Sequence, residues 1–182
     1  MAKETLSPAR QEVRKHRRVL LAILRVCMGW VFLWAFFDKL LGLGFATCKD
    51  AGLLCEKAWV MGGSPTAGFL SRASGPLAEV FQWMGATPGV STVVSILFMA
   101  GLFGIGIALI LGAGMKLAAY GGSTLLVLMF LAAPPTNNPF LDDHLVYAIV
   151  LFLLQWLNAG HFYGLGHWWE NHAFVKKNKW LD

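Results

Sequence analysis

A long apolar run near the N-terminus carries charged residues toward both of its ends, and this feature constrains the fold most. The run Val19–Leu43 is apolar enough to enter a bilayer, yet it contains Arg25 near one end and Asp38 and Lys39 near the other. A charged side chain at the centre of a membrane helix costs at least ~2.5–3.5 kcal/mol, so such residues face a partner helix or a wet cavity. We therefore expect a helical membrane bundle with a polar strip in its interior.

The composition favours a membrane protein over a nucleic-acid-binding one. Of the 182 residues, 57% are hydrophobic and 14% are charged, against ~25% charged in ordinary soluble domains. The formal net charge is +5, and basic residues gather at the chain ends beside apolar runs. That arrangement favours contact with anionic lipid headgroups. We expect a multi-pass protein of the cell membrane, with the lipid bilayer as a partner and without nucleic acid.

The apolar runs predict an all-α integral membrane protein, a bundle of four transmembrane helices within residues 19–165. The spans are expected at about 19–43, 90–111, 115–133 and 144–165, after a basic arm (1–18) and before an aromatic and basic tail (166–182). By the positive-inside rule, the basic arm and tail place both termini in the cytoplasm. The long loop between the first two spans then lies on the extracytoplasmic side.

Small residues at every fourth position predict close packing between the second and third spans. They are Ala100, Gly104, Ala108 and Gly112 in one span, and Gly114, Ala118 and Gly122 in the other. In the long loop, Pro76 is expected to start a short amphipathic helix. We expect this loop to lie on the bilayer as a lid.

Two cysteines of the long loop, Cys48 and Cys55, are disulfide candidates because the predicted extracytoplasmic side is oxidising. Their spacing differs from that of a Cys-x-x-Cys redox motif. This difference favours a structural disulfide, while a redox-active dithiol stays open as the alternative.

The polar residues of the first and fourth spans are expected to meet near the outer end of the bundle. If these two helices are antiparallel neighbours, Asp38 and Lys39 come close to Asp142, Asp143 and His144. Lys39 then pairs with one of the two aspartates. The alternative is that these polar groups pair only to hold the helices together, as interhelical hydrogen bonds do.

The functional interpretation of this polar strip is a quinone site. A quinone head needs hydrogen-bond donors and acceptors at the depth of the headgroups, and His144 exchanges protons near neutral pH. We expect Asp38, Lys39 and His144 to be catalytic, and the cofactor to be bound by Trp34, Tyr147, Asp142 and Asp143. At the inner end, Arg25 either approaches Gln155 and Asn158 or reaches the cytoplasmic headgroups.

Three histidines in the last part of the chain, His161, His167 and His172, are candidate metal ligands by residue type alone. Their spacing does not place them on one face of a helix, and no carboxylate or thiolate joins them in the sequence pattern. The sequence therefore predicts no metal site.

Four segments resemble the DoxX/DoxD-like membrane proteins, a family that includes the membrane subunit of thiosulfate:quinone oxidoreductase. They follow one another in order from about Leu24 onward: Arg25–Lys39, Ala58–Thr66, Asn138–Tyr147 and Gly164–Glu170. The resemblance implies a four-helix fold with a cytoplasmic N-terminus. It also implies electron transfer from a sulfur compound to membrane quinone, with further membrane or extracytoplasmic redox subunits as partners. No catalytic residue carries over from the family by a motif.

Two other classes of function stay open at this point. The first is a non-catalytic accessory or assembly subunit of a larger respiratory or redox-stress complex, whose outer loop docks a partner. The second is a small transporter, which is less favoured because the chain lacks the two-half repeat and broken helices of many transporters.

Overall fold

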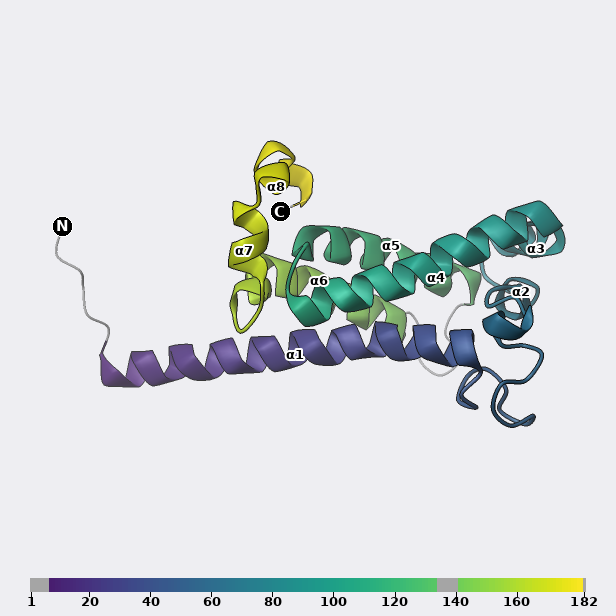
Figure 1. Ribbon diagram of the computed structural model, residues 1–182, viewed down its shortest axis with the longest axis horizontal. Coiled ribbons are helices and arrows are strands. Elements are labelled where there is room, and N and C mark those ends of the chain that lie inside the picture. The colour runs from purple at the N-terminus through teal and green to yellow at the C-terminus, as the bar shows by residue number, and fades with distance from the viewer. Residues whose placement is uncertain (1–6, 134–140, 182) are drawn as a thin grey trace.

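The computed structural model describes residues 7–133 and 141–181, and this part of the chain is helical without any strand (Figure 1). The main helices are α1 (Pro8–Leu41), α3 (Ala78–Ala86), α4 (Pro88–Leu111), α5 (Met115–Ala132) and α6 (Asp143–Trp156). The shorter ones are η1 (Trp59–Met61), α2 (Ala67–Leu70), η2 (Ala159–His161), α7 (Gly166–Asn171), α8 (Ala173–Lys177) and η3 (Lys179–Leu181). These described residues are therefore all-α, as predicted.

Among the described residues, three helices are long and apolar enough to cross a membrane: α1, α4 and α5. Helix α6 has 14 residues, which is about 21 Å at 1.5 Å per residue, against ~30 Å for a hydrocarbon core. The fourth span was predicted to reach residue 165, but helix α6 ends at Trp156. Asn158 then adopts a left-handed conformation with φ of 51° and turns the chain into η2.

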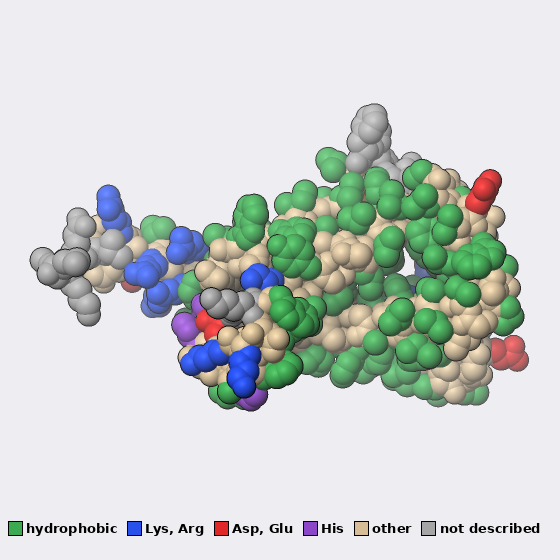
Figure 2. All heavy atoms as spheres, turned by 90° about the horizontal axis from the view of Figure 1, so that it is seen from above, with side chains coloured by type: hydrophobic (Ala, Val, Ile, Leu, Met, Phe, Trp, Pro, Cys, Tyr) green, Lys and Arg blue, Asp and Glu red, His purple; other side chains and the backbone are tan. Residues whose placement is uncertain are grey.

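The predicted basic arm is part of the first helix. Helix α1 starts at Pro8 and continues to Leu41, and proline suits this start because its missing N–H would have no partner in the first turn. Its first turns project beyond the other helices, carry exposed basic side chains, and lie toward the same end of the molecule as α7 and α8 (Figures 1 and 2). We name this end the tail end, and the opposite end, with residues 44–87, the loop end.

The helices pack in the order α1, α4, α5, α6. Helix α1 packs mainly along α4, and α6 packs mainly along α5, whereas α1 and α6 contact each other only sparsely. The expectation that the first and fourth spans are neighbours is therefore confirmed only in part, because each of them packs mainly along another helix. The two helices still meet in the centre, because Phe32 of α1 and Leu151 of α6 belong to the same buried apolar cluster.

The close approach of α1 and α4 depends on glycines that the four-residue pattern did not single out. A Cβ atom on Gly29 of α1 would lie 2.9 Å from the Gly106 carbonyl oxygen of α4, and one on Gly106 would lie 2.6 Å from Leu33 Cγ. By contrast, a Cβ on Gly104, a member of the predicted stripe, would meet no atom within 4 Å. At these two glycines the backbones of α1 and α4 approach each other closely.

The long loop folds against the helices through polar and backbone contacts. Thr66 and Ser95 of α4 are both buried, and their hydroxyl oxygens lie 2.7 Å apart. The backbone N–H of Ser74 donates to the carbonyl of Ala132 at the end of α5. The predicted loop helix forms as α3, where Phe81 is the buried residue.

Gly106→Ala is expected to lower the thermal stability of the detergent-solubilised protein. The added methyl group would push against Leu33, and overpacking of this kind costs roughly 1–3 kcal/mol. Gly104→Ala is the matched control, because the same methyl group there enters open space. Thermal unfolding followed by circular dichroism checks the pair, and equal midpoints for the two variants would contradict the tight crossing.

Candidate functional site

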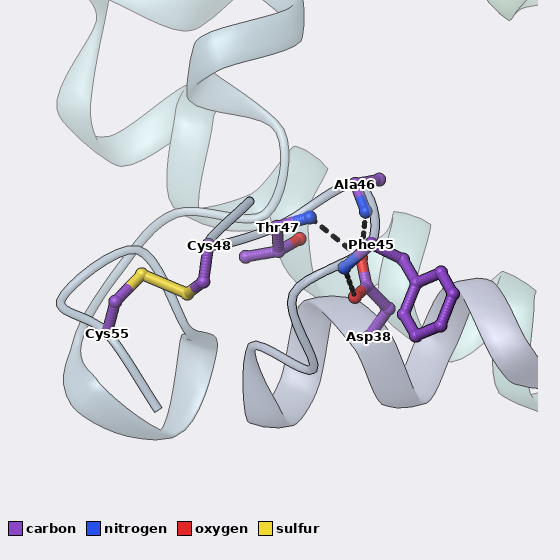
Figure 3. The surroundings of a disulfide bond; sticks show 6 residues. All are labelled: Asp38, Phe45, Ala46, Thr47, Cys48 and Cys55. Carbon is purple, nitrogen blue, oxygen red and sulfur yellow. Dashed lines mark hydrogen bonds between the residues drawn. A yellow bond between two sulfur atoms is a disulfide. The ribbon is translucent and has the colours of Figure 1, made fainter. Parts of the chain in front are cut away.

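Asp38 is a structural anchor for the start of the long loop. Its side chain is 2% exposed, and its carboxylate accepts hydrogen bonds from the backbone N–H groups of Phe45, Ala46 and Thr47 at 3.1, 3.0 and 2.8 Å (Figure 3). A buried charge is tolerated when hydrogen bonds replace its hydration. The predicted catalytic carboxylate is therefore fully engaged by the backbone.

The disulfide candidates do form a bond, which joins Cys48 to Cys55 (Figure 3). Cys48 follows directly after the residues that bind Asp38, and it is buried. The disulfide and the Asp38 carboxylate together hold the chain from residue 45 to residue 55 against the end of α1.

Lys39 lies beside Asp38 on α1, yet its ammonium faces an aromatic ring. The half-buried side chain places Nζ 5.8 Å from the centre of the Phe98 ring of α4, within the range of a cation–π interaction. Among the described residues it makes no ion pair with Asp142 or Asp143. The predicted pairing is therefore absent, because Lys39 is directed toward α4, the main partner of its helix.

Asp142 and His144 form a hydrogen-bonded pair at the start of α6. His144 Nδ1 lies 2.6 Å from Asp142 Oδ2, while Asp142 Oδ1 accepts from the backbone N–H of Leu145 at 3.1 Å and so caps the helix. Burial acts to raise the pKa of Asp142, but the hydrogen bonds and the charge of His144 outweigh it and hold this pKa below its usual value. Of the predicted site residues, these two are the ones joined by a direct hydrogen bond.

The remaining predicted residues lie around this end of the bundle. Tyr147 is half-buried and packs against the central apolar cluster. Trp34 packs edge-on against Phe45, with ring centres 4.9 Å apart. Asp143 is exposed, so it is the predicted site residue with the least structural support.

Arg25 has a structural role that the sequence did not reveal. It is 1% exposed, and its guanidinium donates to the carbonyls of Leu109 and Ile110 at the end of α4, at 2.6 and 3.0 Å. A second nitrogen donates to the carbonyls of Phe162 and Tyr163. Arg25 is therefore bound by backbone carbonyls, because the free carbonyls at a helix C-terminus attract cations, while its buried Nε atom has no hydrogen-bond partner among the described residues.

A second cluster of polar side chains, at the tail end, was missed by sequence reasoning. His161 of η2 is hydrogen-bonded through Nε2 to Glu170 Oε1 of α7, and the His161 and His167 rings stack with centres 4.1 Å apart. The ligand atoms of His161, His167 and Glu170 all lie within 4.8 Å of one another. The i, i+3 spacing of His167 and Glu170 was visible in the sequence, but the turn that returns His161 to them was not.

A cavity of about 210 Å³ adjoins this cluster. His161 and Glu170 form part of its wall, together with Gln155 of α6. The Gln155 Oε1 atom is buried, and it has no hydrogen-bond partner among the described residues. The tail end thus holds a polar cavity, whereas the loop end holds the predicted quinone residues.

Comparison with known proteins adds no family. No family model matches the chain, and searches of curated proteins and of solved structures found no match either.

Asp142→Asn is expected to destabilise the protein at pH 7, and less so at pH 3. The asparagine still caps α6, so the change removes mainly the charge that interacts with His144. Because the pKa of Asp142 is lowered by folding, its contribution is present above the unfolded pKa of about 4 and is lost as the pH falls through the folded value. Unfolding midpoints measured at both pH values check this. Asp143→Asn, at the exposed neighbour, is the control, and an equal pH dependence for both variants would contradict the assignment.

Proposed function

We propose that the chain is the membrane subunit of a quinone-linked redox system, and that the quinone head binds beside Lys39 at the loop end. The observation that carries the proposal is the environment of the Lys39 ammonium. It lies in a membrane helix, half-buried over Phe98, and no carboxylate of the described residues lies within ion-pair distance. Such a group is costly in an apolar setting, and it is free to donate a hydrogen bond to a quinone carbonyl.

The surroundings of Lys39 suit a flat aromatic ligand. Phe98 lies beneath the ammonium, and Phe36, three residues before Lys39 on the same helix, packs with it against the central apolar cluster, so both supply ring surfaces. Figure 2 shows a hollow toward the loop end, with a basic side chain visible inside it. In this proposal Lys39 orients the quinone head and the apolar walls hold its tail.

Reduction of a quinone takes up two electrons and two protons. In this proposal the Asp142–His144 pair passes the two protons to the quinone one after the other and takes each from the surrounding water, since the adjacent carboxylate fixes the orientation of the imidazole. Asp38 keeps a positioning role, because its carboxylate is bound to three backbone N–H groups. The resemblance to DoxX/DoxD-like proteins suggests thiosulfate or another sulfur compound as the electron donor.

Lys39→Met is expected to weaken quinone binding by at least ~10-fold, the equivalent of one charge-assisted hydrogen bond of about 1.4 kcal/mol or more. Lys49→Met, at an exposed lysine of the same end, is the matched control. Purified protein in nanodiscs is titrated with a short-chain ubiquinone analogue, and reduction of the analogue by thiosulfate is followed in parallel. Unchanged quinone binding by a correctly folded Lys39→Met variant would overturn the proposed quinone site.

A second candidate function is an accessory subunit whose loop end docks a partner protein. Several large apolar side chains in the first part of the loop are 52–71% exposed: Phe45, Leu53, Leu54, Val60 and Met61. The disulfide and Asp38 hold the segment from residue 45 to residue 55 in place. A rigid loop with an apolar surface is suited to a protein partner or to the membrane interface.

The two proposed functions predict different results for a double variant that carries Leu53→Ser and Leu54→Ser. If the loop docks a redox complex, a complex that co-purifies in mild detergent is lost from this double variant, while Lys39→Met retains it. If the quinone site is the function, the double variant keeps its quinone affinity. A loop variant that loses neither a partner nor quinone reduction would contradict the accessory function.

A further inference from the structure

We propose that His161, His167 and Glu170 form a binding site for a divalent transition-metal ion of the Zn²⁺ class. Their ligand atoms lie within 4.8 Å of one another in the described structure. Two imidazoles and one carboxylate are a ligand set that Zn²⁺ and its neighbours in the first transition row accept readily. The site lies at the tail end, so it is separate from the proposed quinone site.

The fold brings these ligands together from two short helices. His167 and Glu170 are three residues apart in α7 and share a face of that helix. His161 comes from η2, which follows the left-handed turn at Asn158. Gly160 and Gly166 permit the approach, because a Cβ on Gly166 would lie 2.7 Å from His161 Cδ2 and 2.8 Å from the Gly160 carbonyl oxygen.

The present arrangement needs one small change to hold an ion. The His161 and His167 rings are nearly parallel, with an interplanar angle of 4°, whereas an ion must lie close to the plane of both rings. His167 is exposed, so its ring is free to tilt toward the other two ligands. The ion would replace the proton shared by His161 and Glu170, since metals bind the neutral imidazole and the carboxylate.

A purely structural alternative is that the stacked imidazoles and Glu170 only fasten α7 to η2. The cavity favours the metal site over that alternative. It has room for water molecules beside His161 and Glu170, and the buried Gln155 Oε1 atom on its wall has no partner among the described residues. A water molecule bound to the ion could donate to such an oxygen.

Three protein ligands leave a fourth position on a tetrahedral ion, as in catalytic zinc sites, whereas structural zinc sites use four. This position would open to the cavity, where Lys116 also forms part of the wall. The positive charge of the ion itself favours an anionic fourth ligand, such as hydroxide, over a neutral one. The ion would also link α7 to η2, and so hold the tail against the helix bundle.

The test uses the full chain in nanodiscs, with any polyhistidine tag removed and bound metal stripped by a chelator. ZnCl₂ is titrated by calorimetry, and CoCl₂ is added separately because Co²⁺ in a tetrahedral site absorbs visible light strongly. The expected result is one ion per chain and a higher thermal midpoint with Zn²⁺. His167→Ala and Glu170→Gln should each weaken binding by at least ~100-fold, since even second-shell losses cost 10–100-fold.

The control is His172→Ala, which removes an exposed histidine of the same tail outside the cluster. It should bind Zn²⁺ as the unaltered chain does. Glu170→Gln is nearly the same size as the native residue and can still accept from His161, so it keeps the test independent of folding. The proposal is overturned if Zn²⁺ does not bind saturably, if Glu170→Gln binds with unchanged affinity, or if His172→Ala loses binding equally.

Discussion

The structure depends on how hydrogen bonds stabilise two buried charges of α1. Arg25 and Asp38 are each no more than 2% exposed, and each would be prohibitive in an apolar setting without partners. Both find those partners in backbone groups. Arg25 takes the free carbonyls at the end of α4 and of residues 162 and 163, while Asp38 takes the N–H groups of residues 45–47. Helix α1 is thereby held at one end of the bundle by the positive charge of Arg25 and at the other end by the negative charge of Asp38.

These contacts change the roles that can be assigned to the polar residues of the first span. From the sequence, Asp38 and Lys39 looked like one functional unit, because they are adjacent and share the outer end of a helix. In the structure Asp38 is committed to the backbone, and Lys39 faces the Phe98 ring instead of a carboxylate. The proposal for quinone binding therefore rests on Lys39, with Asp38 holding the loop beside it.

Most of the helix boundaries could be predicted from the sequence, because hydropathy and glycine or proline positions fix them. The starts and ends of α4 and α5 lie within two residues of the predicted ones. The shortness of α6 could not be foreseen, since apolar residues continue past Trp156 and only the conformation of Asn158 ends the helix. Helix partners could not be foreseen either, because several helices carry small residues at similar spacing, and only three-dimensional contacts show that Gly29 and Gly106 lie at a close crossing of α1 and α4.

The site residues also include some that could be predicted from the sequence and some that could not. Residue type and the predicted side of the membrane favoured the Cys48–Cys55 bond, which the structure contains. The hydrogen bond between Asp142 and His144 was not predicted, because Lys39 was the expected partner of the aspartates. The cluster of His161, His167 and Glu170 was not predicted either, because its spacing makes sense only after the chain turns back between α6 and α7. Sequence patterns of this kind reveal ligands on one helix, and they miss ligands that a turn brings together.

The contacts of Arg25 also bear on how the chain enters the membrane during synthesis. Its first carbonyl acceptor is 84 residues further along the chain, so α1 is made long before its guanidinium has anything to bind. Until α4 has been synthesised, the Arg25 guanidinium is expected to stay near water or a lipid headgroup. Gly112 then lets the end of α4 close over the arginine, since a Cβ there would lie 2.5 Å from its Nη1 atom. Insertion of α1 and of α4 is thus expected to be a single coupled event.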